Sequence, residues 1–259
     1  MSKCKLLLYI GMLIIVSCKK REDFYKVEGA LLIEMLQEYD NFNTENVIFR
    51  NKEGKSIPKF DLSTLDYTKL GFDLYISEDT IIREVRLRNP ELKDDLLRLS
   101  FSNKNFKPSD QIELRDIQKS EVKRLLDQVY ITDQQVRHDG STEDIRTADR
   151  INQKIVVSIL EKYGLPRMSE VGYNGVLGCF LTIQHASPEL RLYYYPKFLK
   201  ASENNQIDLF AIALLEDRIL TDHGYSQIYG TQYGALEAFP IKDSINVNQR
   251  RKEMGLDPL

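Results

Sequence analysis

The spacing of hydrophobic residues changes between the two halves of the chain. Residues 72–76 and 82–87 alternate hydrophobic and polar side chains on either side of the polar segment 77–80, and this pattern predicts a β-hairpin. From about residue 111 onward, hydrophobic residues recur instead at intervals close to 3.6 positions, which is typical of helices that bury one face. We therefore expect strands in the first part of the chain and helices in the second.

Capping residues divide the second half of the chain into successive helices. Thr142 precedes two acidic residues and is predicted to begin a helix that Gly164 ends. Ser187 and Pro188 begin another helix as its cap and first helical residue. Between these two helices, residues 175–186 are almost entirely hydrophobic, which predicts a helix that is buried on most sides.

The pattern as a whole predicts a mainly α fold. We expect residues 111–259 to form an antiparallel helical bundle with a small β-hairpin around Gly234. A smaller α+β region is expected over residues 28–110, and residues 18–27 are predicted to be a tether.

The first 18 residues have the order of features found in a secretory signal. Lys3 and Lys5 precede the hydrophobic segment 6–16, which is too short to span a bilayer. Ser17 and Cys18 follow, and this ending resembles the bacterial lipoprotein signal, in which the cysteine is acylated and becomes the first residue after cleavage. A buried N-terminal helix or an uncleaved anchor is the alternative interpretation.

The resemblance to a lipoprotein signal implies a location in the cell envelope. We expect residues 1–17 to be removed and the membrane to be a partner through lipidated Cys18. Several acyl chains, each contributing about 0.8 kcal/mol per buried methylene, anchor a protein stably. Lys19, rather than an acidic residue, follows the cysteine, and we therefore expect the outer membrane to be the site of anchoring.

The composition argues against a nucleic-acid partner. The 259 residues are 42% hydrophobic and 29% charged, as in ordinary globular proteins. With 36 lysines and arginines against 39 aspartates and glutamates, no positive excess exists to neutralise a phosphate backbone. The remaining cysteine, Cys179, lies in a hydrophobic run and is predicted to be structural. No motif indicates a cofactor, and no ligand spacing indicates a metal, so we expect neither.

Polar side chains interrupt the hydrophobic pattern at four points in the second half of the chain. Because burying an unpaired charge or amide is costly, we expect these side chains to contact one another. The residues are Asp149 and Asn152, Gln184 and His185, Asp217 and Arg218, and Tyr229 with Gln232.

Two interpretations of this polar set are open. In the first, Asp217 orients His185 as a general base, and the protein is a hydrolase-like enzyme. The side chains expected to contact the substrate are then Arg218, Tyr229, Gln232, Asp149 and Asn152. In the second, Asp217 and Arg218 tie the hairpin to the helical bundle, and His185 caps the buried helix.

Three short strings occur in a fixed order within this region. They are Gln184-His185-Ala186, Asp217-Arg218 and Tyr229-Gly230-Thr231-Gln232. Their order resembles a bacterial family of uncharacterised domains with a QHA, DR and YGTQ signature, over about residues 115–259. The resemblance implies an independent helical domain attached to varied N-termini, with no known reaction. Family members typically have an acid where this chain has Ser187, which weakens the catalytic interpretation.

These observations favour a lipid-anchored protein of the cell envelope that acts as a binding or interaction module. Its partner is expected to be an envelope protein or a small ligand. A hydrolase-like enzyme that uses His185 is the alternative.

Overall fold

The structure is a computed structural model that describes residues 24–38, 45–234 and 238–259. Within these ranges it contains eight α-helices and a five-stranded sheet, which confirms a mainly α protein with a smaller α+β part. No helix in the described ranges is both long and apolar enough to cross a bilayer. The expected signal and Cys18 lie outside the described residues.

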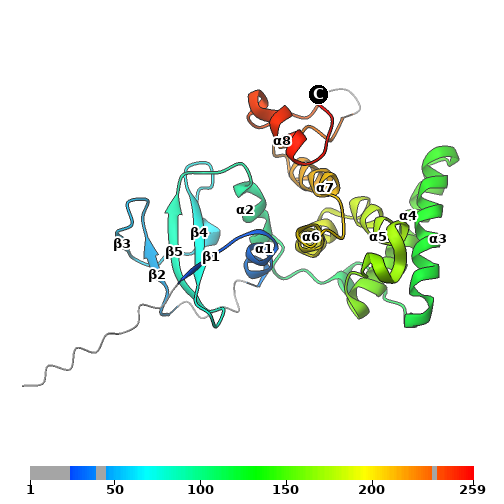
Figure 1. Cartoon of the computed structure of the whole chain (residues 1–259), viewed down its shortest axis with the longest axis horizontal. Helices are drawn as coiled ribbons and strands as arrows, with labels where there is room; N and C mark the ends of the chain where they lie inside the picture. The colour runs from blue at the N-terminus through cyan, green and yellow to red at the C-terminus, as the bar shows by residue number, and fades with distance from the viewer. Residues whose placement is uncertain (1–23, 39–44, 235–237) are drawn as a thin grey trace, which may run out of the picture.

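The sheet belongs to the first part of the chain and has the strand order β1-β4-β5-β2-β3 (Figure 1). β4 and β5 pair antiparallel, with Leu74 opposite Val85, which confirms the expected hairpin. β2 joins the other side of β5 in parallel. The strands are β1 (Tyr25–Val27), β2 (Ile48–Arg50), β3 (Ser56–Ile57), β4 (Gly71–Ile76) and β5 (Ile82–Arg88).

Two helices cover the face of this sheet that is turned toward the rest of the protein (Figure 1). They are α1 (Gly29–Gln37) and α2 (Asp94–Ser102). The alternating residues Phe72, Leu74 and Ile76 of β4 are buried, because alternate side chains of a strand point to the same face.

The described residues of the second part of the chain form six α-helices. They are α3 (Val122–Asp139), α4 (Thr142–Tyr163), α5 (Met168–Gln184), α6 (Pro188–Glu203), α7 (Leu209–Asp222) and α8 (Val247–Glu253). Short 3₁₀ helices occur at Leu62–Thr64, Pro108–Asp110, Lys119–Glu121 and Ser244–Asn246. α1 packs against α6 and α2 against α7, and one hydrophobic core extends through both parts of the chain.

The ends of α4 show how closely local sequence sets a helix boundary. The N-cap is Ser141 and not Thr142, because Ser141 Oγ accepts a hydrogen bond from the Asp144 N–H at 3.2 Å. The Asp144 carboxylate accepts the Ser141 N–H at 2.9 Å in return, which completes a capping box. Gly164 ends the helix as expected, with a φ of 73° that favours glycine.

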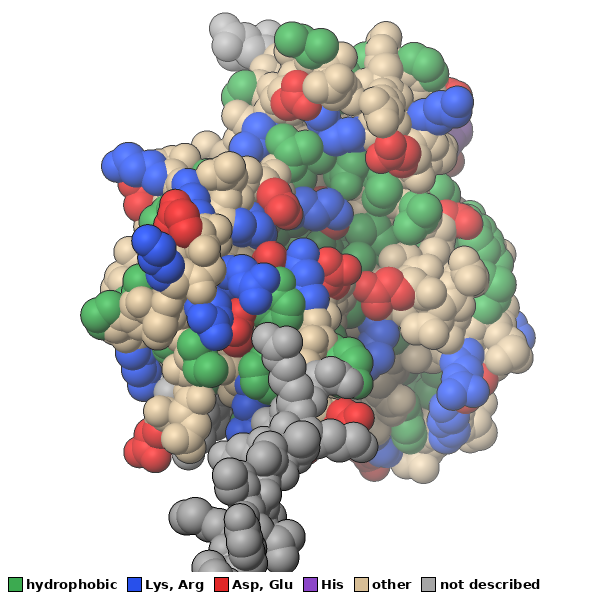
Figure 2. Space-filling model, turned by 60° about the vertical axis from the view of Figure 1, so that its left-hand side comes forward, with side chains coloured by type: hydrophobic (Ala, Val, Ile, Leu, Met, Phe, Trp, Pro, Cys, Tyr) green, Lys and Arg blue, Asp and Glu red, His purple; other side chains and the backbone are tan. Residues whose placement is uncertain are grey.

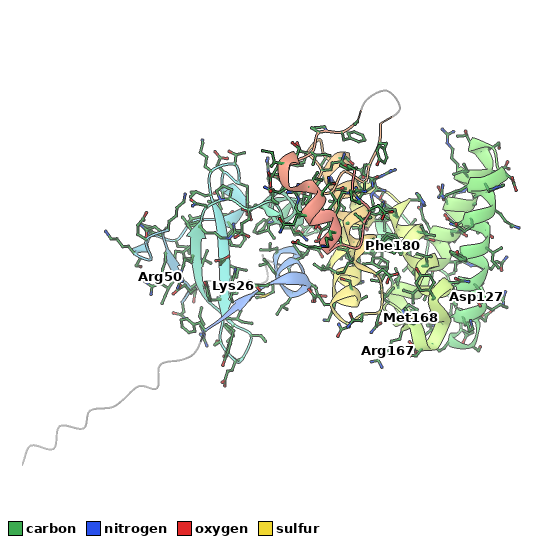
Figure 3. The ribbon with its side chains drawn as sticks, turned by 45° about the horizontal axis from the view of Figure 1, so that its top comes forward. Lys26, Arg50, Asp127, Arg167, Met168 and Phe180 are labelled. Carbon is green, nitrogen blue, oxygen red and sulfur yellow. The ribbon has the colours of Figure 1, made fainter. Side chains whose placement is uncertain are left out.

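α3, α4 and α5 lie side by side in alternating directions, and α3 and α5 are parallel. Lys123 Nζ donates to the Val171 carbonyl at 3.3 Å. Further along, a Cβ on Gly178 would lie 3.1 Å from the Leu126 carbonyl oxygen, so only glycine allows this close approach without displacement. This register brings the end of α5 beside the end of α3 and the start of α4. Phe180 of α5, labelled in Figure 3, lies in the interior of the bundle. It packs edge-to-face on Phe198 of α6.

The segment around Gly234 is less regular than the expected hairpin. Single bridges pair Gln227 with Ile241 and Tyr233 with Ala238, and the described residues form no longer ladder there. The side chain of Gln227 adds to the main-chain pairing of this residue, because its amide donates to the carbonyls of Gln232 and Phe239. Its Oε1 accepts the Gln232 N–H at 2.9 Å.

Candidate functional site

His185 lies at the point where the first three helices of the bundle meet the start of α6. It is the C-cap of α5, and its N–H donates to the Leu181 carbonyl at 3.0 Å. Its own carbonyl accepts Nε2 of Gln153 from α4 at 3.4 Å. Its side chain is partly buried, and none of the hydrogen bonds found among the described residues involves the imidazole ring.

Burial and surrounding arginines keep His185 uncharged. Burial lowers the pKa of His185 to about 4, and the positive charges of Arg137, Arg218 and Arg191 act in the same direction. The Asp133 carboxylate opposes them. The imidazole is therefore neutral at physiological pH.

On one side of His185, α3 and α4 are joined by an arginine between two aspartates. Arg137 Nε donates to Asp133 at 3.0 Å, and Arg137 Nη2 donates to Asp149 at 2.6 Å. Burial raises the pKa of Asp149, and Arg137 partly offsets this. Asn152 follows one turn later on the same face of α4 and is 3% exposed. Arg137 therefore connects Asp149 to the surroundings of His185, and Asn152 lies one turn away from Asp149 on the same helix.

On the other side of His185, Arg191 of α6 connects the end of α5 to α7. Its Nη1 donates to the carbonyls of Gln184 and Ala186, and its Nη2 donates to the Asp222 carboxylate. The Arg191 side chain is almost fully buried, and burial lowers its pKa. Asp222 also lies 3.7 Å from Arg218 Nε, so it holds two arginines together.

Three of the predicted residues meet around one carbonyl group of α7. Gln184 Nε2 donates to the Leu214 carbonyl at 3.2 Å, and Gln232 Nε2 approaches the same oxygen at 3.4 Å. Arg218 Nη1 donates to Gln232 Oε1 at 3.2 Å. The three short strings of the sequence therefore contribute side chains to one location, although they are far apart in the chain.

Asp217 has a different role from the one expected in the catalytic interpretation. Its two carboxylate oxygens accept the backbone N–H groups of Ile228, Tyr229 and Thr231 at 2.6 to 3.2 Å, and also the Thr231 hydroxyl at 2.9 Å. Burial raises the pKa of Asp217, and these hydrogen bonds act in the opposite direction. The predicted pairing of Asp217 with His185 was wrong, because the Asp217 carboxylate faces the 228–231 segment. The next residue, Arg218, points about 100° away around the helix and contacts Gln232 instead.

Like Asp217, Tyr229 lies outside the group of side chains around His185, and its hydroxyl contacts Glu216. Its hydroxyl donates to Glu216 Oε2 at 3.0 Å, while Tyr195 and Lys93 donate to Glu216 Oε1 at 2.6 and 2.7 Å. Glu216 is fully buried. Because Lys93 precedes the bundle in the chain, this carboxylate joins the two parts of the protein. Glu216 was not predicted, although a second acid beside Asp217 in a hydrophobic run was the available signal.

We call the polar side chains gathered around His185 the His185 cluster. Its members joined by the interactions above are Asp133, Arg137, Asp149, Gln184, His185, Arg191, Arg218, Asp222 and Gln232. We add two buried residues by helix spacing: Asn152, one turn after Asp149 on α4, and Thr182, one turn before His185 on α5. Three arginines balance three aspartates, so the His185 cluster carries no formal net charge while His185 is neutral. Four members, Asp133, Arg137, Arg191 and Asp222, were not predicted, because charges at these positions resemble those of an ordinary solvent-exposed helix face.

Several buried polar atoms of the His185 cluster have no hydrogen-bond partner. Across the described residues, five buried side-chain atoms are in this state, and all five belong to the cluster: Asn152 Nδ2, Thr182 Oγ1, Gln184 Oε1, Arg191 Nε and Arg218 Nε. Native proteins pair the large majority of their buried polar atoms. A concentration of unpaired atoms in one place therefore requires a local explanation.

Metal and thiol chemistry receive no support from the described residues. They contain no group of three or more histidine, cysteine or acidic side chains that could hold a metal ion. Cys179 is buried as expected, and burial raises the pKa of its thiol to about 12, so it stays protonated and unreactive.

Comparison with known proteins gives a family but no reaction. No curated protein and no solved structure matches the chain. Residues 126–259, just over half of the chain, match the model of a family of unknown function, DUF6624. The matched range contains every member of the His185 cluster, whereas Lys93 and the sheet lie outside it. The chain therefore belongs to this family of unknown function.

Proposed function

We propose that this protein is a lipid-anchored binding module of the bacterial cell envelope, and that its family domain holds a small ligand in the His185 cluster. The observation that carries the proposal is the set of five unpaired buried polar atoms in this one cluster. Each such atom costs about 1–3 kcal/mol of stability. A bound ligand that supplies the missing partners would recover this cost.

The unpaired atoms indicate the chemistry of the ligand. Three of them are N–H donors, on Asn152, Arg191 and Arg218, and Gln184 Oε1 is an acceptor. Arg218 Nε has no hydrogen bond but lies 3.7 Å from the Asp222 carboxylate. A small molecule with several acceptor oxygens and at least one hydroxyl or N–H donor fits this set. Because the cluster has no net charge, the ligand is neutral or carries a single charge.

Two observations argue against the interpretation of the protein as an enzyme that uses His185 as a general base. A general base works best when its pKa lies near the working pH, whereas burial and arginines lower that of His185 to about 4. The carboxylate expected to orient His185 binds the 228–231 backbone instead. We therefore propose binding rather than hydrolysis.

Thermal shift measurements with small carboxylates, sugars and amino acids test the binding proposal. At a concentration 100 times its Kd, a ligand adds about 2.7 kcal/mol to the free energy of unfolding. We expect at least one compound to raise the Tm of the wild type, and Arg218→Leu to abolish the shift. Arg150→Leu, on the exposed face of α4, is the matched control and should keep it. A shift that persists in Arg218→Leu would contradict the assignment.

The lipid anchor rests on the signal-like N-terminus and is proposed at Cys18. We propose the outer membrane because Lys19, and no acidic residue, follows the cysteine. When cells are grown with radiolabelled palmitate, the full chain should be labelled and Cys18→Ala should not. Cys179→Ala should remain labelled, because that thiol is buried. Equal labelling of the full chain and Cys18→Ala would refute the anchor.

A further inference from the structure

Exposed hydrophobic side chains gather where the described part of the chain begins. Phe24, Tyr25, Leu31 and Ile81 each expose 37% to 49% of their surface. Tyr25 of β1 is paired with Ile76 of β4, and Ile81 lies in the turn that follows β4. Figure 2, which brings the sheet side of the molecule forward, shows hydrophobic side chains on this surface among charged ones.

A groove of about 520 Å³ between α1 and α6 continues this surface. Its hydrophobic lining is made by Leu31, Met35, Ile76, Phe106, Tyr193 and Pro196. Two acids, Glu34 and Glu38, and two bases, Lys104 and Lys197, lie around it. The surface and groove together are thus hydrophobic with a rim of balanced charge. We call them the β1–α1 face.

The distance from Cys18 to this face is limited by the covalent chain. Seven residues lead from Cys18 to Tyr25, and a fully extended chain spans at most about 3.6 Å per residue, or roughly 25 Å here. Acyl chains on Cys18 would lie in the bilayer. The start of β1 would then be held within this distance of the membrane surface, whatever path the intervening residues take.

We propose that the β1–α1 face docks on the phospholipid bilayer to which Cys18 anchors the chain; the inference rests on the proposed lipid anchor. Exposed hydrophobic patches on soluble domains mark protein or membrane contacts, and the short tether brings this patch to the membrane. Aromatic side chains such as Tyr25 are well suited to the headgroup region. Because the rim charges balance, the face is suited to zwitterionic lipid, and docking should be insensitive to salt.

Docking of this face fixes the orientation of the protein on the membrane. The sheet lies at one end of the molecule and α3 at the other (Figure 1). Lys26, next to Tyr25 on β1, marks the sheet end in Figure 3, and Asp127 marks α3. The surface from β1 to the groove between α1 and α6 would therefore contact lipid, whereas α3 lies outside this face.

Fluorescence quenching by lipid tests the docking face on the intact acylated chain. Leu31→Cys and, independently, Ile81→Cys would each be labelled with an environment-sensitive dye, and the chain would be reconstituted on phosphatidylcholine vesicles. Ile131→Cys on α3 is the matched control, because Ile131 is 53% exposed and Leu31 is 45% exposed. Cys179 is buried and will not react. Vesicles with brominated acyl chains then report contact with the bilayer interior.

We expect brominated lipid to quench the dye at positions 31 and 81 several-fold more than at position 131, at low and high salt. Flotation of the chain with the vesicles reports the anchor separately. Equal quenching at all three positions on floating vesicles would overturn the docking face and leave the anchor intact. A chain that does not float would refute the anchor, and the docking with it. A blue-shifted dye that brominated lipid does not quench would show that protein, such as a second copy of this chain, covers the face, and would also overturn the proposal.

Discussion

Asp217→Ala is expected to lower the free energy of unfolding by about 4 kcal/mol. The substitution removes the acceptor for three backbone N–H groups of the 228–231 segment and for the Thr231 hydroxyl. Asp217 is fully buried, so water cannot take its place without opening the segment. The loss should therefore resemble that caused by breaking a buried charged network rather than a surface contact.

Denaturant unfolding of the wild type and two variants measures this effect. Asp127→Ala is the matched control, because Asp127 lies on the exposed side of α3 and forms a surface ion pair with Lys123. Its loss should stay below about 0.5 kcal/mol. An Asp217→Ala loss as small as that of the control would show that Asp217 does not hold the 228–231 segment.

His185→Gln is expected to make the free energy of unfolding less dependent on pH. In the folded protein burial lowers the pKa of His185 to about 4, from an ordinary value of 6.5. Between these values the unfolded chain binds a proton on His185 that the folded chain does not. The wild type therefore loses stability as the pH falls from 6.5 toward 4, by up to about 3 kcal/mol. The contribution of this residue to the pH dependence fades as the pH rises past 6.5, because the unfolded chain then also releases the proton.

The difference in unfolding free energy between pH 7 and pH 4.5, measured for each variant, isolates the contribution of His185. Any loss that His185→Gln causes at every pH cancels in this difference. His138→Gln is the control for the substitution itself, because the side chain of His138 is 84% exposed at the end of α3 and lies outside the His185 cluster. A His185→Gln profile as steep as the wild type would show that His185 is not buried among arginines in solution.

Most of the helices and the central hairpin followed from local features of the sequence. Alternation alone located β4 and β5, since each buries one face of the sheet. Caps located α4 to within one residue, because Ser141 and Gly164 set its ends through contacts a few residues away. The short strands β1 and β3 could not be predicted, since two or three residues carry too little pattern and are held by long-range pairing.

The gathering of polar residues was predicted, but their pairing was not. Hydrophobic context identified His185, Asn152 and Gln232 as polar groups that need partners. Which partner each one has depends on the register of three helices and on where the 228–231 backbone crosses α7. Arg191 could not be recognised from the sequence, because its neighbours resemble those of an exposed arginine. In the structure it is buried between α5 and α7.

The thermal stability of Asn152→Leu tests most directly whether the His185 cluster is kept for a ligand. Asn152 is buried with an unpaired Nδ2, and leucine is similar in size without a polar atom. If the amide is retained for binding, Asn152→Leu should raise the free energy of unfolding of the ligand-free protein by about 1–2 kcal/mol, and its Tm by several degrees. A Tm lowered by several degrees would show that Asn152 holds the fold together, and would contradict a ligand site in the His185 cluster.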